Sequence, residues 1–462
     1  MSGNIALLIF SLIFIAIIII YLSKRWPELD IIDLYIIFVG LHFGLYPFIR
    51  SLHFGPDVVF DFRSASPWPL GLVFVQLLAC LVIIRSVSLC FPKEFLKLLN
   101  IKYLLQQCSS INKYILFIFY ICLIAFQIFS YYEFGIITYI MPADFAKIGK
   151  SLPYWFTSVR TIYNLLAFFV FFGLFANLVT ARKYRRLAWI ILTIIFALIA
   201  TIYGRRYFIE MLITSVIFWF AYAKINLFRW RVLAVAGGLL GVFFIFSNVY
   251  QGYRGVIQNV GQINSQKLAN PLHAALNFRA TLSNLAQRPG TWEFDFLVIN
   301  NQLHKSGMTM QGKVFWEGFK SAIPRFFWPS KQFSLIDDML AALYAVNPKS
   351  IDIGKNLFGL AQIDFGYFSI ILVPAIILII IISLGYLVKL TVNYPTFLTL
   401  FTANIVFYLI NIEENGNELF FMFRNILIIG VLFMIYLLAH NAFLKFIPVK
   451  PLHDSPNNHP VG

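Results

Sequence analysis

Positively charged side chains that could bind an anion stand at the ends of long apolar segments in this sequence. A guanidinium offers a planar fork of N–H donors that matches phosphate, and charges at membrane depth are costly enough to be paired or functional by default. We expect these side chains to hold a diphosphate at the level of the lipid headgroups. The candidates for substrate binding at these ends are Arg205, Arg206, Arg254 and Arg424, and the long polar loop adds the candidates Arg279, Arg325, Lys331 and Trp328.

Carboxylates and histidines supply a second kind of chemistry, the removal of a proton from a hydroxyl group. The candidate bases are Asp364, Glu413, Glu414, His273 and His304. The sequence does not choose among them, and a lone histidine is more often structural than catalytic. No HExxH, GxSxG, Walker or CxxC pattern occurs, and the four cysteines lack the spacing of metal ligands. Hydrolase and nucleotide-driven chemistries are therefore not supported.

Four of these cations, and the aromatic Trp328, also have a structural role open to them. Arg205 and Arg206 would also serve as interfacial anchors whose heads reach the headgroup region, and Arg279 would form a salt bridge with the edge of a span or reach out of its apolar stripe to the interface. Arg424 would pair with neighbouring glutamates and hold two spans together. Trp328 would either stack on a sugar ring or anchor its loop at the interface. The residue types alone leave these alternatives open.

Composition identifies lipid as the solvent of this chain. Of 462 residues 60% are hydrophobic and 12% are charged, with a mean hydropathy of +0.79. A helix needs about 20 apolar residues to cross a bilayer. The sequence therefore predicts an all-α polytopic membrane protein with about eleven spans. The windows are 4–22, 31–49, 67–90, 113–132, 158–179, 187–203, 207–223, 232–250, 367–388, 395–411 and 420–441.

Lysine and arginine in the short loops predict how the chain is oriented. Positive residues in such loops stay on the cytoplasmic side of the membrane. Successive loops lie on opposite sides of the membrane, and the loops of one side carry more Lys and Arg than those of the other. The richer set includes Lys24 and Arg25 after the first span and four cations between 182 and 186. The N-terminus is therefore expected outside and the C-terminus inside. The formal charge of +16 does not indicate nucleic acid, because no run of Lys and Arg with interleaved aromatics occurs.

One long polar loop divides the chain. We expect an N-terminal transmembrane bundle over 1–250, a large outer loop over 251–366, C-terminal spans over 367–447 and a cytoplasmic tail over 448–462. Within the loop, Asn270 and Gly290 are typical of the start and stop of a helix, whose apolar stripe includes Arg279. The loop is predicted to form a lid over an arginine-rich mouth.

Several segments resemble a known family. Residues 323–331, IPRFFWPSK, resemble the PR-aromatic-WP-x-K signature of bacterial O-antigen polymerases of the Wzy type and related oligosaccharide repeat unit polymerases. Residues 359–368, GLAQIDFGYF, resemble the glycine- and aromatic-rich start of the span that follows the large loop in those proteins. Residues 204–206 are similar to their Gly-x-Arg element, and Arg279 with Gly290 matches an Arg-x10-Gly spacing. Eleven spans with an outer N-terminus depart from the commoner twelve or more.

The resemblance implies a glycosyltransferase with a GT-C-like architecture in the bacterial inner membrane, its N-terminus periplasmic and its C-terminus cytoplasmic. It implies a metal-independent transfer without a cofactor between two undecaprenyl-diphosphate-linked glycans, one the donor and one the acceptor. A chain-length regulator protein is a further partner that it allows. The cations would then stabilise the departing lipid diphosphate, and one of the five bases would deprotonate the acceptor hydroxyl.

Three other activities fit parts of the sequence. An O-antigen ligase shares the architecture and the donor but delivers glycan to the lipid A core; the 323–331 segment favours the polymerase. A lipid-linked oligosaccharide flippase or transporter is expected to show paired halves and interrupted helices, whereas the halves here are unequal. A polyprenyl-phosphate-dependent glycosyltransferase is expected to carry paired acids in its first outer loop, where this chain has only the separated Asp57 and Asp61.

Overall fold

The regular structure of the chain is helical throughout the residues that the computed structural model describes. These are residues 3–51, 66–134, 154–181, 183–200, 205–225, 238, 291–304, 309–323, 328, 355–412 and 416–446. In the first half the helices are α1 (Gly3–Arg25), α2 (Ile31–Gly40), η1 (Leu41–Leu45), α3 (Tyr46–Ser51), α4 (Pro67–Ser88), α5 (Lys93–Leu98), α6 (Ile101–Cys108), α7 (Lys113–Phe134), α9 (Tyr154–Thr180), α10 (Lys183–Ala200) and α11 (Arg205–Tyr222). In the second half they are α15 (Thr291–His304), α16 (Lys313–Ala322), α18 (Leu357–Phe365), η5 (Gly366–Phe368), α19 (Ser369–Thr391), α20 (Pro395–Asn411) and α21 (Glu418–Phe446).

Five helical segments among the described residues are long and apolar enough to cross a membrane. They are Gly3–Arg25, Ile31–Ser51, Pro67–Ser88, Leu357–Thr391 and Glu418–Asn441. A sixth is present if α6 and the start of α7, which meet at a bend of 88°, form one span. Shorter apolar helices cover Leu165–Thr180, Ile213–Tyr222 and Pro395–Asn411. The prediction of an all-α membrane protein is confirmed for this part of the chain, and the count of eleven spans stays a prediction.

Two sequence predictions fall on residues that the structure does not describe. The span expected at 232–250 has a single described residue, the helical Gly238. The helix expected between Asn270 and Gly290 has none. The proposed division at 250, 366 and 447 is therefore described only in part.

The first three long helices are joined by close contacts along their length. α2 runs antiparallel to α1, since Gly40 packs on Ile18 while Gly44 packs on Ile15. α4 runs in the same direction as α1, because the rings of Phe10 and Phe74 stack with centroids 5.2 Å apart near the start of both helices. α1 and α4 thus finish at the face where α2 begins. This places the positive residues at the ends of spans one and three together, as the alternation of loops predicts.

α20 is enclosed by other helices along most of its length. Every residue from Leu398 to Asn411 is buried. α9, α19 and α21 pack around it, and the ring of Phe407 stacks on that of Phe168 in α9 with centroids 4.8 Å apart. A helix that is apolar all round and enclosed by others is the expected core element of a membrane protein. Its polar side chains must therefore find partners inside the protein.

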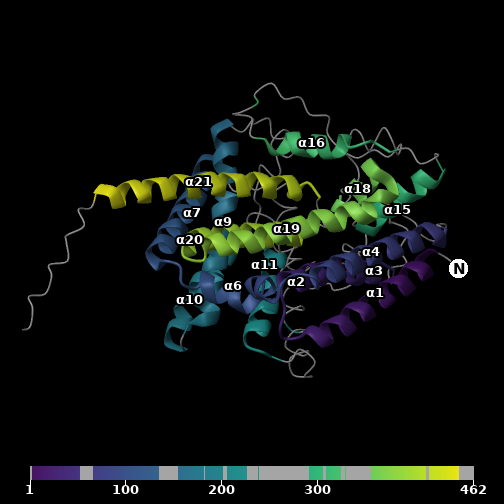
Figure 1. Ribbon diagram of the computed structural model, residues 1–462, viewed down its shortest axis with the longest axis horizontal. Coiled ribbons are helices and arrows are strands. Elements are labelled where there is room, and N and C mark those ends of the chain that lie inside the picture. The colour runs from purple at the N-terminus through teal and green to yellow at the C-terminus, as the bar shows by residue number, and fades with distance from the viewer. Residues whose placement is uncertain are drawn as a thin grey trace, which may run out of the picture.

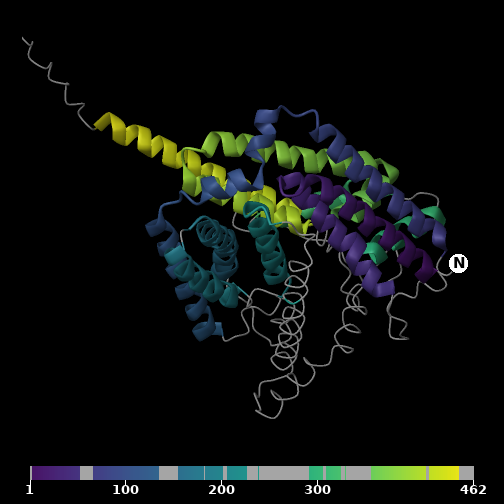
Figure 2. The same cartoon turned by 90° about the horizontal axis from the view of Figure 1, so that it is seen from below.

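The long helices form two groups rather than one parallel bundle. α19 and α21 run along the long axis of the molecule, with α1 and α4 inclined to the same general direction (Figure 1). α7, α9 and α10 stand together at a steep angle to them, which the turned view also shows (Figure 2). A simple bundle of eleven parallel spans would not show this crossing.

Candidate functional site

The helices from the long loop meet the last two long helices at one end of the molecule. The backbone N–H of Leu357, at the start of α18, donates to the carbonyl of Ile412 after α20, with 3.2 Å between the atoms. The N–H of Gly416, before α21, donates to the carbonyl of Lys355. We call the polar residues gathered here the α18–α20–α21 junction: Lys355, Asn356, Tyr408, Glu418, Arg424 and Asn425.

Arg424 stands at the edge of a buried polar chain within this junction. Its Nε donates to Oδ1 of Asn425 at 3.2 Å, and its guanidinium carbon lies 5.0 Å from the centre of the Phe421 ring. The Nδ2 of Asn425 in turn donates to the hydroxyl of Tyr408 at 2.9 Å and to Oδ1 of Asn404 at 3.3 Å. Arg424 is half-buried, while Tyr408, Asn404 and Asn425 are buried. The guanidinium of Arg424 is thus hydrogen-bonded to a chain of buried neutral side chains.

Arg424 has two predicted roles, to bind substrate or to pair with a glutamate and hold two spans together, and its surroundings bear on the second. Tyr408 and Glu418 lie close enough to interact electrostatically with its guanidinium. Glu418, one of the three glutamates expected as partners, therefore lies near the guanidinium, and a direct ion pair with it stays a prediction. Glu413 and Glu414, the other two glutamates expected as partners, lie outside the described residues. The substrate-binding role remains a prediction.

Lys355 is a cation at this junction that the sequence pattern did not single out. It stands directly before α18 and is half-buried. Burial lowers the pKa of its ammonium group to about 8, because desolvation disfavours the charged form. Lys355 therefore changes charge close to physiological pH, which Arg424 does not do. A lysine at the start of an apolar segment was the available signal.

α15 and α18 are joined by a second set of buried polar contacts. Nδ2 of Asn356 donates to Oδ2 of Asp295 at 3.0 Å, and Oδ1 of Asn356 accepts from the N–H of Gly359 in the first turn of α18. Gly359 has no room for a Cβ, which would overlap Asp295 and Phe294. The glycine predicted to open this segment therefore allows the close approach of α15.

Asp364 has a structural role that the sequence analysis did not assign to it. Its two carboxylate oxygens accept from the backbone N–H groups of Val314 at 3.1 Å and Phe315 at 2.8 Å, in the first turn of α16. The carboxylate is buried, and it satisfies amides that a helix N-terminus leaves unpaired. This geometry favours a cap for α16 over the predicted role as a general base.

The remaining predicted site residues are described in part or not at all. Arg205 and Arg206 begin α11, His304 is the last residue of α15, and Trp328 is half-buried. Outside the described residues lie Arg254, Arg279, Arg325, Lys331, His273, Glu413 and Glu414. Asp364 and Arg424 are linked through α16, because Asp364 caps α16 and α16 packs on the start of α21. That the other candidates lie near these two residues stays a prediction.

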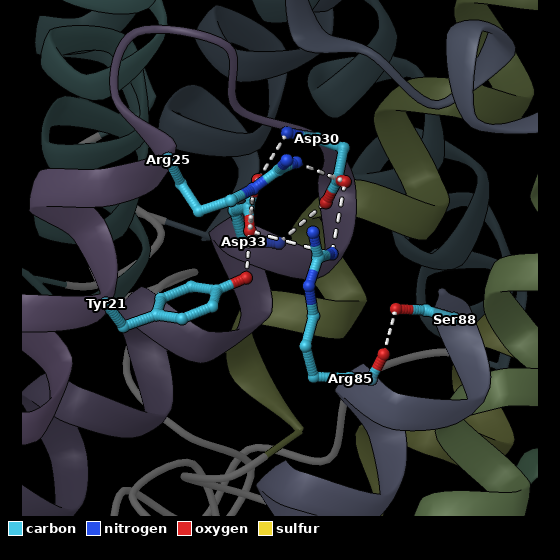
Figure 3. A network of polar contacts seen from close by, with 6 residues as sticks. All are labelled: Tyr21, Arg25, Asp30, Asp33, Arg85 and Ser88. Atoms are coloured by element: carbon cyan, nitrogen blue, oxygen red, sulfur yellow. Dashed lines mark hydrogen bonds and ion pairs between the residues drawn. The ribbon is translucent and has the colours of Figure 1, made fainter. Parts of the chain in front are cut away.

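A different group of charged residues lies where α1 and α4 end, at their C-termini. We call it the α1–α2–α4 cluster: Tyr21, Arg25, Asp30, Asp33 and Arg85. Nη2 of Arg25 lies 3.0 Å from Oδ2 of Asp30 and 3.0 Å from Oδ2 of Asp33. Nη1 of Arg85 lies 3.3 Å from Oδ2 of Asp30, and the hydroxyl of Tyr21 donates to Asp33. These side chains converge from three helices (Figure 3).

The same two aspartates also form the N-terminal cap of α2. Oδ1 of Asp30 accepts from the N–H of Asp33, and Oδ2 of Asp33 accepts from the N–H of Asp30, both at 2.9 Å. Burial and the neighbouring Asp33 raise the pKa of Asp30 to about 6. Two arginines thus face two aspartates, and cations and anions balance. The arrangement fastens α1, α2 and α4 to one another.

Comparison with protein-family models, with curated proteins and with solved structures yields no match. Among the described residues, no three of His, Cys, Asp and Glu come together in a group that could hold a metal ion.

Proposed function

We propose that this chain is a glycosyltransferase of the bacterial inner membrane that polymerises undecaprenyl-diphosphate-linked oligosaccharide repeat units into O-antigen or a related surface polysaccharide. The observation that carries the proposal is the half-buried Arg424 at the α18–α20–α21 junction, with the ionisable Lys355 at the same junction. The resemblance of 323–331 to the polymerase signature adds to it. We place the junction at the periplasmic face, where the positive-inside pattern puts this end of the spans.

The proposed reaction exchanges one bond for another. The bond between the anomeric carbon of the donor glycan and its lipid diphosphate breaks, and the hydroxyl oxygen of the acceptor glycan bonds to that carbon. The electron pair of the broken bond leaves with the diphosphate, and the proton of the hydroxyl passes to a base. Arg424 and Lys355 would stabilise the negative charge that develops on the leaving group.

The base is best sought beside the junction. Asp364 already accepts two backbone N–H groups. Glu413 and Glu414 follow Ile412 in the sequence, and the carbonyl of Ile412 contacts α18. We therefore propose to test these two glutamates first, ahead of His273 and His304. In the same proposal Arg205, Arg206, Arg254, Arg279, Arg325 and Lys331 complete the cationic mouth.

Deletion of the gene in its host, followed by electrophoresis of the surface glycan, tests the proposal. A single repeat unit on the lipid A core is the expected result. Lipid-linked long chains that remain unattached to the core would instead indicate a ligase. Loss of every outer-face intermediate would indicate a flippase.

Complementation of the deletion strain with point variants then tests the diphosphate-binding residues. Arg205→Ala and Arg325→Ala are expected to abolish polymerisation while the protein stays in the membrane. Long chains in both strains would contradict their role.

A further inference from the structure

α16 presents two large aromatic side chains on its outward face. Trp316 is 54% exposed and Phe319 is 50% exposed. Their rings stack nearly parallel, with centroids 5.8 Å apart. The opposite face of the helix consists of Val314, Gly318 and Ala322, all buried. A helix on the surface of a water-soluble protein is expected to turn polar side chains outward, and this one turns aromatic rings outward.

The buried face of α16 packs on two neighbouring helices. Gly318 lies so close to the ring of Phe420 in α21 that a Cβ at this position would overlap it. Phe315 meets the same ring edge to face, with centroids 5.7 Å apart. Val314 joins an apolar cluster with residues of α15 and α18. α16 is therefore held at a defined place and cannot turn its aromatic pair inward.

This place is the beginning of a membrane span. Phe420 is in the first turn of α21, which begins at Glu418, and α16 lies beside that end of α21 (Figure 1). Further along α21 a stripe of exposed apolar side chains follows at intervals of four residues: Phe423 at 40%, Leu427 at 70% and Val431 at 59%. Such a stripe on a span faces lipid. Trp316 and Phe319 thus stand at the level where this stripe begins.

The polar groups of α16 fit the same level. Lys313 is exposed at the first position of the helix, and Lys320 pairs with Glu317 one turn along. Aromatic rings of Trp with cations beside them are typical of the zone where lipid headgroups meet acyl chains. The cap from Asp364 ties the first turn of α16 to α18.

We propose that the Trp316–Phe319 face of α16 inserts into the boundary between the headgroups and the acyl chains of the bilayer, at the end where α21 begins. The occupant of this face is bilayer lipid, because α16 packs on Phe420 at the end of α21 from which the lipid-facing stripe runs. Through Asp364 the inserted helix sets the height of α18 relative to the membrane surface. The inference does not depend on the chemistry that the chain performs.

Site-directed spin labelling in vesicles of phosphatidylethanolamine and phosphatidylglycerol tests this proposal. Of the described cysteines, Cys90 and Cys122 are exposed and Cys80 and Cys108 are buried. Replacing the exposed pair with serine gives a background in which Trp316→Cys and Phe319→Cys carry the label one at a time. Power saturation then compares collisions of each label with oxygen, which enters lipid, and with a nickel chelate, which stays in water.

Two further positions calibrate the measurement. Gln311→Cys, exposed just before α16, serves as the aqueous reference, and Leu427→Cys, 70% exposed within α21, serves as the lipid reference. We expect the ratio of oxygen to nickel accessibility at 316 and 319 to lie between these references. A ratio equal to that at 311 would overturn the proposal, since the face would then be in water. Labels shielded from both reagents would also overturn it, because protein would then cover the face.

Discussion

The α1–α2–α4 cluster and the α18–α20–α21 junction place charge in the membrane protein in opposite ways. In the cluster two arginines meet two aspartates directly, and the side chains of both aspartates are nearly or wholly inaccessible to solvent. In the junction Arg424 is held by an amide and an aromatic ring, and Lys355 has a pKa lowered by burial. Charges that neutralise each other inside the protein fasten helices. Arg424, whose side chain bonds a neutral amide and lies over an aromatic ring, keeps the capacity to bind an anion.

Arg424→Ala should have the largest effect on activity. Removing a preorganised cation from a developing negative charge is expected to slow polymerisation by roughly 100- to 1,000-fold. The measurement is the incorporation of repeat units into long chains by purified protein in vesicles. Arg424→Lys keeps the charge but not the fork of donors and should retain part of the rate.

The control for this variant is Lys389→Ala, which removes an exposed cation at the far end of α19. It should leave the rate unchanged. If Arg424→Ala and Lys389→Ala behave alike, Arg424 does not take part in the reaction.

Asp33→Asn should have the largest effect on stability. It removes one partner from a buried group of ion pairs and leaves Arg25 and Arg85 with an excess of positive charge. We expect a loss of about 3 kcal/mol, seen as a lower midpoint of thermal unfolding in detergent. The activity of the protein that remains folded should be unchanged. An unaltered midpoint would show that the cluster does not fasten these helices.

Lys355 should make activity fall as the pH rises. Its pKa of about 8 means that the ammonium is charged below this value and neutral above it. If its charge helps to hold the diphosphate, the rate should decline on passing above pH 8 by up to roughly tenfold. Lys355→Arg keeps the charge throughout this range, so its rate should decline less. A pH profile identical in the two proteins would remove Lys355 from the binding site.

Asp30 should have the smallest effect, on the pH dependence of stability. Its pKa is raised from 3.8 to about 6 on folding, so the folded chain holds this proton more tightly than the unfolded chain. The stability that this proton contributes is complete below pH 4 and is lost as the pH rises through 6. The thermal midpoint of wild type minus that of Asp30→Asn should therefore fall between pH 4 and pH 7. A constant difference would contradict the raised pKa.

The positions of the helices were predictable from the sequence. A described helix lies within each predicted span window except 232–250, whose residues are nearly all outside the described part of the chain. The length of an apolar run is a local property, and lipid requires each such run to satisfy its own backbone hydrogen bonds. The site was predictable to a smaller degree: Arg424 was a candidate and lies at the junction, Asp364 was expected as a base and caps α16, and Lys355 and Tyr408 were not singled out.

The sequence by itself thus determined that this chain is helical and belongs in a membrane, and roughly where its long apolar helices lie. Only the tertiary structure decided what the charged residues do. Asp33 lies inside an apolar run, and its partner Arg85 comes from another helix. Asp364 caps α16 some 50 residues before it in the chain. These roles depend on which helices pack together, and the periodicity of any one segment contains no information about its partners.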